Sequence, residues 1–234
     1  MADEKAFQEE VETICRLYAD APALHEQGVH VISCDEKTGI QALEREVTPL
    51  QPGQCERHDH EYVRHGTQCL IANFEVATGL IMTPTIGDTR TEKDFVRHVQ
   101  NTVETDPAGQ WTFVVDQLNT HKSAGLVEWI AHSCGLTDHL GQKGETGILE
   151  SMETRKAFLS DPSHRIRLIY TPIHASWMNQ IEIWFSILSR RLLKRLIVQS
   201  TAQLKQKIFD FIEYFNRTLA KPFKWTYSGK PLQA

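Results

Sequence analysis

Three acidic residues stand where secondary-structure elements are expected to begin or end. Asp35 follows the apolar strand pattern of residues 29–34, and Asp116 follows that of residues 111–115. Glu182 falls in the first turn of an amphipathic helix pattern. A buried carboxylate is costly unless a partner or a metal compensates its charge. Mg²⁺ prefers oxygen ligands, and two such ions about 3.5–4 Å apart support phosphoryl transfer.

Each acid also has an ordinary structural explanation. Asp35 can form a turn with Lys37 and Gly39, and Asp116 can form an Asx turn that leads into the next helix. Glu182 can be a first-turn charge that interacts favourably with the helix dipole. The residues by themselves leave the structural and the catalytic interpretations open.

The order of patterns predicts an α/β fold with a mixed central sheet flanked by helices. Strands are expected at 29–34, 41–46, 66–79, 80–87, 111–116 and 165–172, and helices at 3–19, 91–105, 123–133, 179–197 and 201–220. In open α/β sheets, sites lie at the carboxyl ends of strands. Asp35 and Asp116 are therefore expected to face one crevice.

The composition is that of an ordinary globular protein, with 41% hydrophobic and 24% charged residues in a chain of 234. No stretch approaches the ~18 apolar residues of a membrane span. Five scattered cysteines favour a reducing cytoplasm over a disulfide framework. The net charge is −5, yet residues 151–234 hold 14 Lys and Arg against 5 Asp and Glu. That basic third is either a phosphate-binding surface or a set of solvated helix faces.

Four long motifs carry a family resemblance. They are DEKTGIQALER, YVRHGTQCLIANFEVATG, VVDQLNTHKS and TPIHASWMNQIEIWFSILSRRLL, and they begin at Asp35, Tyr62, Val114 and Thr171. In this order they resemble bacterial insertion-sequence transposases of the DDE class, in the branch related to the mariner superfamily. One departure is Gln117, where many members have Asn after the second Asp.

The resemblance implies an RNase H-like fold in which Asp35, Asp116 and Glu182 hold two Mg²⁺ or Mn²⁺ ions. It also implies DNA strand cleavage by water, followed by attack of the released 3′-hydroxyl on target DNA. The implied partners are transposon-end DNA, target DNA and a second copy of the chain. The implied location is the bacterial cytoplasm, with association to the nucleoid during the reaction and no membrane contact.

Several further residues are candidates for DNA contact. They are Arg64, His65, His121, Lys122, Asn179, Arg190, Arg191, Lys194 and Arg195. His121 can instead support the metal site or cap the following helix, and Asn179 with Gln180 can cap the Glu182 helix. Arg64 and His65 can instead fix a loop near the active edge. Trp177 and Trp184 can stack on unpaired bases, but a core position is favoured for both.

The domain organisation is expected to have three parts. Residues 1–28 form a helical lead-in, residues 29–222 the catalytic domain and residues 223–234 a tail. The stretch between Asp116 and Glu182 is longer than is usual for the family, and residues 135–164 look like an insertion. The helix-turn-helix region of a full transposase is not recognised, so an inactive, truncated DNA-associated remnant is a second hypothesis.

A third hypothesis is a zinc-stabilised interaction module. Its candidate ligands are Cys55, His58, His60, His65 and Cys69. Their spacing matches no standard zinc module, so this hypothesis ranks below the other two.

Overall fold

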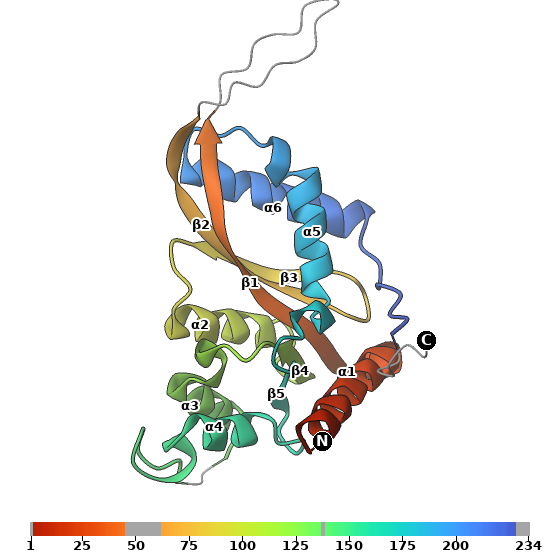
Figure 1. Ribbon diagram of the computed structural model, residues 1–234, viewed down its shortest axis with the longest axis vertical. Helices are drawn as coiled ribbons and strands as arrows, with labels where there is room; N and C mark the ends of the chain where they lie inside the picture. Colours follow the sequence, from red (N-terminus) through yellow and green to blue (C-terminus); the bar gives the residue numbers. More distant parts are fainter. Residues whose placement is uncertain (1, 45–61, 137–138, 228–234) are drawn as a thin grey trace, which may run out of the picture.

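A five-stranded mixed sheet forms the centre of the computed structural model, which describes residues 2–44, 62–136 and 139–227 (Figure 1). The strands are β1 (Val29–Glu44), β2 (Val63–Glu75), β3 (Ile81–Gly87), β4 (Gln110–Val115) and β5 (Ile166–Tyr170), in the spatial order β3-β2-β1-β4-β5. β1, β2 and β3 pair antiparallel, whereas β4 and β5 run parallel to β1. The expected mixed α/β sheet is confirmed.

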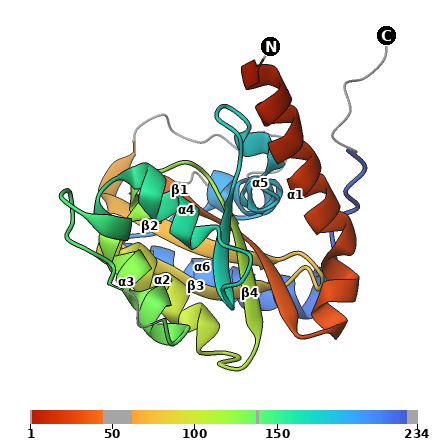
Figure 2. The ribbon, with the colours of Figure 1, turned by 90° about the horizontal axis from the view of Figure 1, so that it is seen from below.

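Six α-helices cover the two faces of the sheet. They are α1 (Ala2–Glu26), α2 (Glu92–Val103), α3 (Ala124–Ser133), α4 (Met152–Leu159), α5 (Ile181–Arg191) and α6 (Thr201–Thr218). α1, α5 and α6 pack on one face, and α2, α3 and α4 pack on the other (Figures 1 and 2). Adjacent strand residues supply the two cores, since Val31 belongs to the first and Ile32 to the second.

Side-chain caps fix the starts of two predicted helices. Thr91 and Asp94 form a capping box at α2, and the Ser123 hydroxyl accepts the Leu126 N–H at α3. His121 therefore does not cap α3. α1 runs to Glu26, well beyond the predicted end of this helix. α4 lies inside the predicted insertion and packs its buried Leu159 with the core of α3.

β1 differs most from the sequence prediction. It does not stop at Asp35 but continues as one strand of 16 residues, so the separate strand at 41–46 is part of it as far as Glu44. The rest of that predicted strand lies outside the described residues. Gly39, with φ 69°, sits at a register shift inside the strand, so Asp35 forms no turn with it. The strand is long because β2 pairs with it beyond the end of β4.

The last described segment packs onto the core. The Phe223 ring stacks on Phe74 with centroids 4.5 Å apart, and Trp225 meets Tyr18 edge-on at 5.1 Å. Part of the predicted tail, residues 228–234, lies outside the described residues. Among the helices of the described ranges, none combines the length and apolarity needed to cross a bilayer.

Candidate active site

Asp35 is a buried carboxylate in the middle of β1. Its side chain accepts the Glu36 backbone N–H at 2.7 Å and a longer hydrogen bond from Asn179 Nδ2 at 3.3 Å. Asn179 Nδ2 also donates to the Cys34 carbonyl at 2.9 Å. The residue is only 7% exposed, so the strand and this amide define where the carboxylate lies.

A buried polar network joins β1 to the start of α5. The Ser33 hydroxyl donates to Asn179 Oδ1 and accepts the Ile181 N–H at 2.8 Å. Tyr18 of α1 donates its hydroxyl to the Met178 carbonyl at 3.0 Å. These contacts satisfy polar groups that would otherwise be buried without partners, and they fix the entry of α5 against the strand.

Glu182 lies one residue beyond this anchor, in the first turn of α5, as predicted. Its neighbours Ile181 and Phe185 are buried, whereas Glu182 itself is exposed. The helix N-terminus favours a negative charge at this position. Because the anchor at Ser33 holds the helix start, Glu182 lies near enough to Asp35 for its charge to help raise the pKa of that carboxyl.

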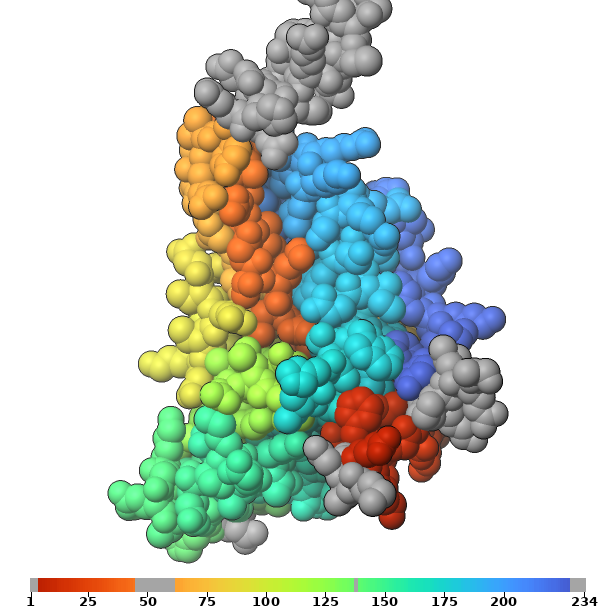
Figure 3. Space-filling view, viewed as in Figure 1, coloured from red at the N-terminus to blue at the C-terminus, as the bar shows by residue number. Residues whose placement is uncertain are grey.

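Asp116 directly follows β4. The parallel register pairs Ser33 with Val114, so Asp35 and Asp116 come at the same level along their two strands. Asp116 Oδ1 accepts the Leu118 N–H at 2.9 Å, which is the Asx-turn geometry. The structural and the catalytic explanations of Asp116 are therefore compatible. Figure 3 shows the surfaces of β1, the segment after β4 and the start of α5 adjoining on one side of the molecule.

His121 is a buried histidine that bridges Asp116 and a further acid, Glu36. Its Nδ1 lies 2.9 Å from Asp116 Oδ1 and its Nε2 lies 3.1 Å from Glu36 Oε1. Burial acts to lower its pKa, but the hydrogen bonds to Asp116 and Glu36 outweigh it and raise the pKa to about 9. The ring is fully buried, so His121 is not a surface contact to DNA phosphate. It is a protonated group that orients Asp116.

Asp35 and Asp116 have pKa values that shift in opposite directions. Burial is the main reason that the pKa of Asp35 rises to about 7. The charges of Asp116, Glu36 and Glu182 act in the same direction. For Asp116, burial also acts upward, but the hydrogen bonds from His121 and from the Leu118 N–H hold its pKa below the ordinary value.

This donor set fits a hard divalent cation. Three oxygen-bearing side chains share one edge, and their repulsion is relieved when a cation binds between them. Their ligand atoms are not tightly clustered, since the only group within 4.8 Å in the described ranges is His25, His30 and Glu75. Binding of an ion by Asp35, Asp116 and Glu182, the acidic edge, would therefore require that the carboxylates move closer or that a substrate supplies further oxygen ligands.

The structure contradicts a DNA contact by Asn179 and a loop-fixing role for Arg64 and His65. Asn179 is fully buried and faces β1, so it cannot contact DNA, and it caps α5 only through its backbone carbonyl. His65 lies on β2 and pairs with Glu44 at 2.7 Å. Arg64 pairs with Leu43, which is eight residues beyond Asp35 and thus about 26 Å along the strand. Neither Arg64 nor His65 fixes a loop at the active edge.

Other predicted contacts are accessible. Arg190 and Arg191 are exposed at the far end of α5, and Lys194 and Arg195 are exposed in the short turn that follows it. Lys122 is half-buried, with its ammonium 5.5 Å from the centroid of the Tyr170 ring. Trp184 is in the core as expected, but Trp177 is 52% exposed, so the core prediction for it is wrong.

The described residues do not support the hypothesis of a zinc site around Cys55. Cys55, His58 and His60 lie outside them. His65 and Cys69 both lie in β2 and are separated by about 13 Å of extended chain, too far to share one ion. His65 instead pairs with Glu44, and Cys69 is buried.

Sequence reasoning missed three contributors to the site. Glu36 is buried and binds His121, and Ser33 anchors α5. Lys156, from the predicted insertion, places its ammonium 5.3 Å from the centroid of the same Tyr170 ring that Lys122 covers. The adjacent acids Asp35 and Glu36 were the available signal, because neighbouring strand residues face opposite sides of a sheet.

Sequence comparison decides the family, because the DDE superfamily endonuclease model matches residues 30–205, more than half of the chain. The chain belongs to the DDE superfamily of endonucleases. Asp35, Asp116 and Glu182 all lie within the matched range. A search of curated proteins finds no match.

Solved structures support the same fold for this DDE domain. The Mos1 mariner paired-end complex with Mn matches with a TM-score of 0.54 and 12% identity, over 93% of this chain and 56% of that one. The Mos1 transposase paired-end complex with left transposon end gives a TM-score of 0.52 at 9% identity, with the same coverage. The RNase H-like fold is thereby confirmed, and the chain spans about half the length of these relatives.

Asp35→Asn is expected to stabilise the metal-free domain at alkaline pH. The folded-state pKa of Asp35, about 7, lies above the ordinary value of 3.8, so ionising this residue opposes folding. The gain from the substitution should grow between those two pH values and level off above pH 7, at about 2–4 kcal/mol. Urea unfolding from pH 4 to 9 measures it. Asp20→Asn on the exposed side of α1 is the control, and equal, pH-independent effects of the two substitutions would contradict the assignment.

His121→Leu is expected to cost about 3–5 kcal/mol, chiefly because it leaves the Glu36 carboxylate, which is 2% exposed, without its cation, and to a smaller extent because it removes the partner of the partly exposed Asp116. His98→Leu is the matched control: His98 is also fully buried, but burial lowers its pKa to about 3, so it is neutral. That control should cost about 1–3 kcal/mol.

The difference between wild type and His121→Leu should also depend on pH. The stabilisation by His121 is complete below its ordinary pKa of 6.5 and is lost as the pH rises through about 9. Chemical unfolding at pH 6, 8 and 10 measures the change. A difference that is constant across this range, or equal to that of His98→Leu, refutes the charged bridge.

Proposed function

We propose that this chain is the catalytic domain of a metal-dependent transposase, which cleaves DNA at transposon ends and joins the released 3′-hydroxyl to target DNA. The observation that carries the proposal is the placement of Asp35 and Asp116 at the same level of two adjacent parallel strands, with Glu182 of α5 near enough for its charge to act on Asp35. The similar Mos1 structures are paired-end complexes, one with Mn and one with left transposon end, which supports the same chemistry. We place the catalytic domain at residues 29–222.

In this proposal Asp35, Asp116 and Glu182 hold two Mg²⁺ or Mn²⁺ ions. When bound, such ions activate the attacking oxygen and neutralise charge on the phosphate. The chain supplies the positioning: Asn179 orients Asp35, and His121 orients Asp116. Rigid placement of this kind reduces the reorganisation needed at the reacting centre.

The DNA path is proposed to run over the basic groups on either side of the acids. Lys122 and Lys156 lie together over Tyr170, and the electrostatic influence of Asp116 reaches Lys122. On the other side, Arg190 stands eight residues from Glu182, or about 12 Å along α5. The active form is proposed to be a homodimer, since one assembly joins two element ends.

Metal-dependent cleavage tests the proposal. Duplexes made from the DNA that flanks its own gene are incubated with the protein and Mn²⁺ or Mg²⁺, and labelled strands are followed on denaturing gels. Wild type should release a 3′-hydroxyl end and transfer it to a second duplex. Asp35→Asn, Asp116→Asn and Glu182→Gln should each lower the rate at least about 100-fold, because each removes a metal ligand.

Asp210→Asn is the control for this assay, since it removes an exposed carboxylate on α6 that accepts a hydrogen bond from Gln206 in the same helix. It should cleave like wild type. Folded wild-type protein that binds the duplex but yields no metal-dependent product would favour the inactive-remnant hypothesis. Cleavage that survives all three acid substitutions would show that the reaction uses other residues.

The basic end of α5 is expected to contribute to DNA affinity through phosphate contacts. Replacing Arg190, Arg191, Lys194 and Arg195 together by Ala should weaken duplex binding and reduce the slope of log K against log salt by about 2–4. Fluorescence anisotropy from 50 to about 300 mM salt measures the slope. The control variant removes the same charge from exposed residues elsewhere, at Lys5, Arg16, Lys93 and Arg97. Equal slopes for the two variants would exclude α5 from the interface.

A further inference from the structure

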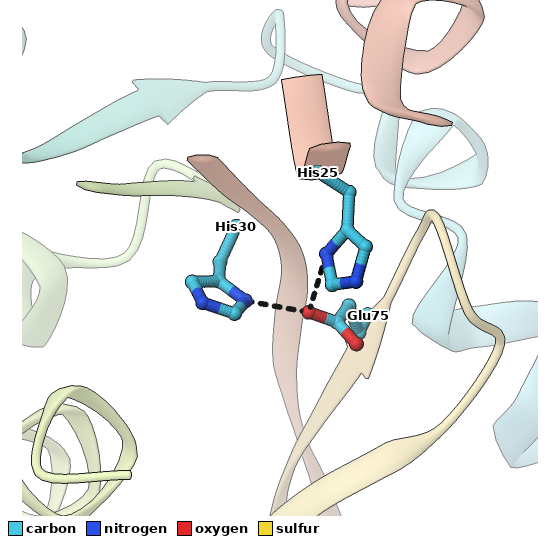
Figure 4. Close-up of side chains that lie close together, drawn as sticks. All are labelled: His25, His30 and Glu75. Carbon is cyan, nitrogen blue, oxygen red and sulfur yellow. Dashed lines mark hydrogen bonds and ion pairs between the residues drawn. The ribbon is translucent and has the colours of Figure 1, made fainter. Parts of the chain in front are cut away.

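A second group of potential metal ligands lies at the start of β1, away from the acids. His25 is in the last turn of α1, His30 is the second residue of β1, and Glu75 is the last residue of β2 (Figure 4). One ligand atom from each lies within 4.8 Å of the other two. His30 and Asp35 are five residues apart on one strand, or about 17 Å, so the two sites are separate.

The three side chains converge on one carboxylate oxygen. His30 Nδ1 lies 2.6 Å from Glu75 Oε1, and His25 Nδ1 lies 3.4 Å from the same atom. His25 Nδ1 is buried and makes no hydrogen bond among the described residues, although it points into this cluster. This nitrogen has only the 3.4 Å ion-pair contact with Glu75, so the loss of its hydration is poorly compensated, and a metal ion bound between the side chains would satisfy it.

Neighbouring side chains fix the orientation of Glu75 and His30, as is usual for metal ligands. The Glu75 carboxylate is almost fully buried, and its other oxygen accepts the Thr78 hydroxyl at 2.6 Å, which leaves Oε1 facing the histidines. His30 Nε2 lies 3.2 Å from Asp106 Oδ2, and the ring stacks on Trp111 with centroids 4.1 Å apart. A carboxylate on the far nitrogen is the usual support of a metal-bound histidine, because it fixes the tautomer.

We propose that His25, His30 and Glu75 bind one Zn²⁺ ion, with a water as the fourth ligand. Two nitrogens and one carboxylate oxygen form a standard zinc donor set. In a tetrahedron with bonds of about 2.0–2.1 Å, ligand atoms stand about 3.3 Å apart. The separation of His25 from Glu75 already matches, and His30 Nδ1 has to move back by less than about 1 Å.

Such an ion has a structural role, because its ligands come from α1, β1 and β2. It ties the end of α1 to two strands of the sheet across a short turn in which Gly28 adopts φ 78°. α1 in turn supports the start of α5 through the hydrogen bond of Tyr18. The ion therefore stabilises the sheet face on which the acidic site is built.

Zinc titration of the whole chain tests the site. After EDTA treatment and dialysis, calorimetry with Zn²⁺ should show one tight equivalent per chain, and Co²⁺ should give the visible absorption of a four-coordinate ion. His25→Ala should lower the affinity at least tenfold while it keeps the His30–Glu75 pair and the fold. Asp106→Asn should lower it by about 10- to 100-fold, since it removes the support of His30.

Two control variants locate the ion. Asp35→Asn with Asp116→Asn removes ligands at the acidic edge, and Cys55→Ser with His58→Ala removes other potential zinc ligands; both should keep full zinc affinity. No zinc binding by wild type, or binding that is lost in a control variant and kept in His25→Ala, overturns the proposal. The readout is metal stoichiometry, so the result is independent of whether the chain cleaves DNA.

Discussion

The hydrogen bonds from Asn179 to β1 are the contact on which the acidic site depends. They connect the carbonyl of Cys34 and the carboxylate of Asp35 to the segment that begins α5. Without them, nothing in this network would hold Glu182 in place relative to Asp35, which lies about 145 residues away in the chain. A fully buried amide with three protein partners has little freedom, so the position of Glu182 relative to Asp35 is set before any ligand arrives.

β1 also organises the other side of the site, because its residues alternate between the two faces of the sheet. Ser33 and Asp35 meet the α5 side, whereas Glu36 meets His121 on the opposite side. Residues 33–36 of β1 thus contact both the start of α5 on one face of the sheet and His121 on the other. The repulsion among the acids is a cost of this arrangement, and His121 offsets only the part that falls on Asp116 and Glu36. The excess charge at Asp35 is what a cation would neutralise.

Local signals in the sequence were sufficient for most elements. The alternation of apolar residues in the strands predicted the sheet class, the helical spacing of apolar residues predicted most helices, and Thr91 marked the start of α2. The length of β1 was not predictable in this way, because it is decided by pairing with β2, far along the chain. His121 and Asn179 were candidates for DNA contact or for helix caps, and His121 also for support of the metal site. Their burial depends on tertiary partners that no local pattern reveals.

The acidic site around Asp35 and the histidine site at the start of β1 offer different ligand atoms, so they are expected to select different metals. The acidic edge offers only carboxylate oxygens, which suit Mg²⁺ and Mn²⁺, whereas the proposed His25–His30–Glu75 site offers imidazole nitrogens, which suit Zn²⁺. At about 17 Å, the sites are farther apart than the Debye length of about 8 Å at physiological salt, so occupation of one has little electrostatic effect on the other. A zinc ion at the turn between α1 and β1 would therefore act through packing. It would hold α1, and with it the start of α5, in the position that the acidic site requires.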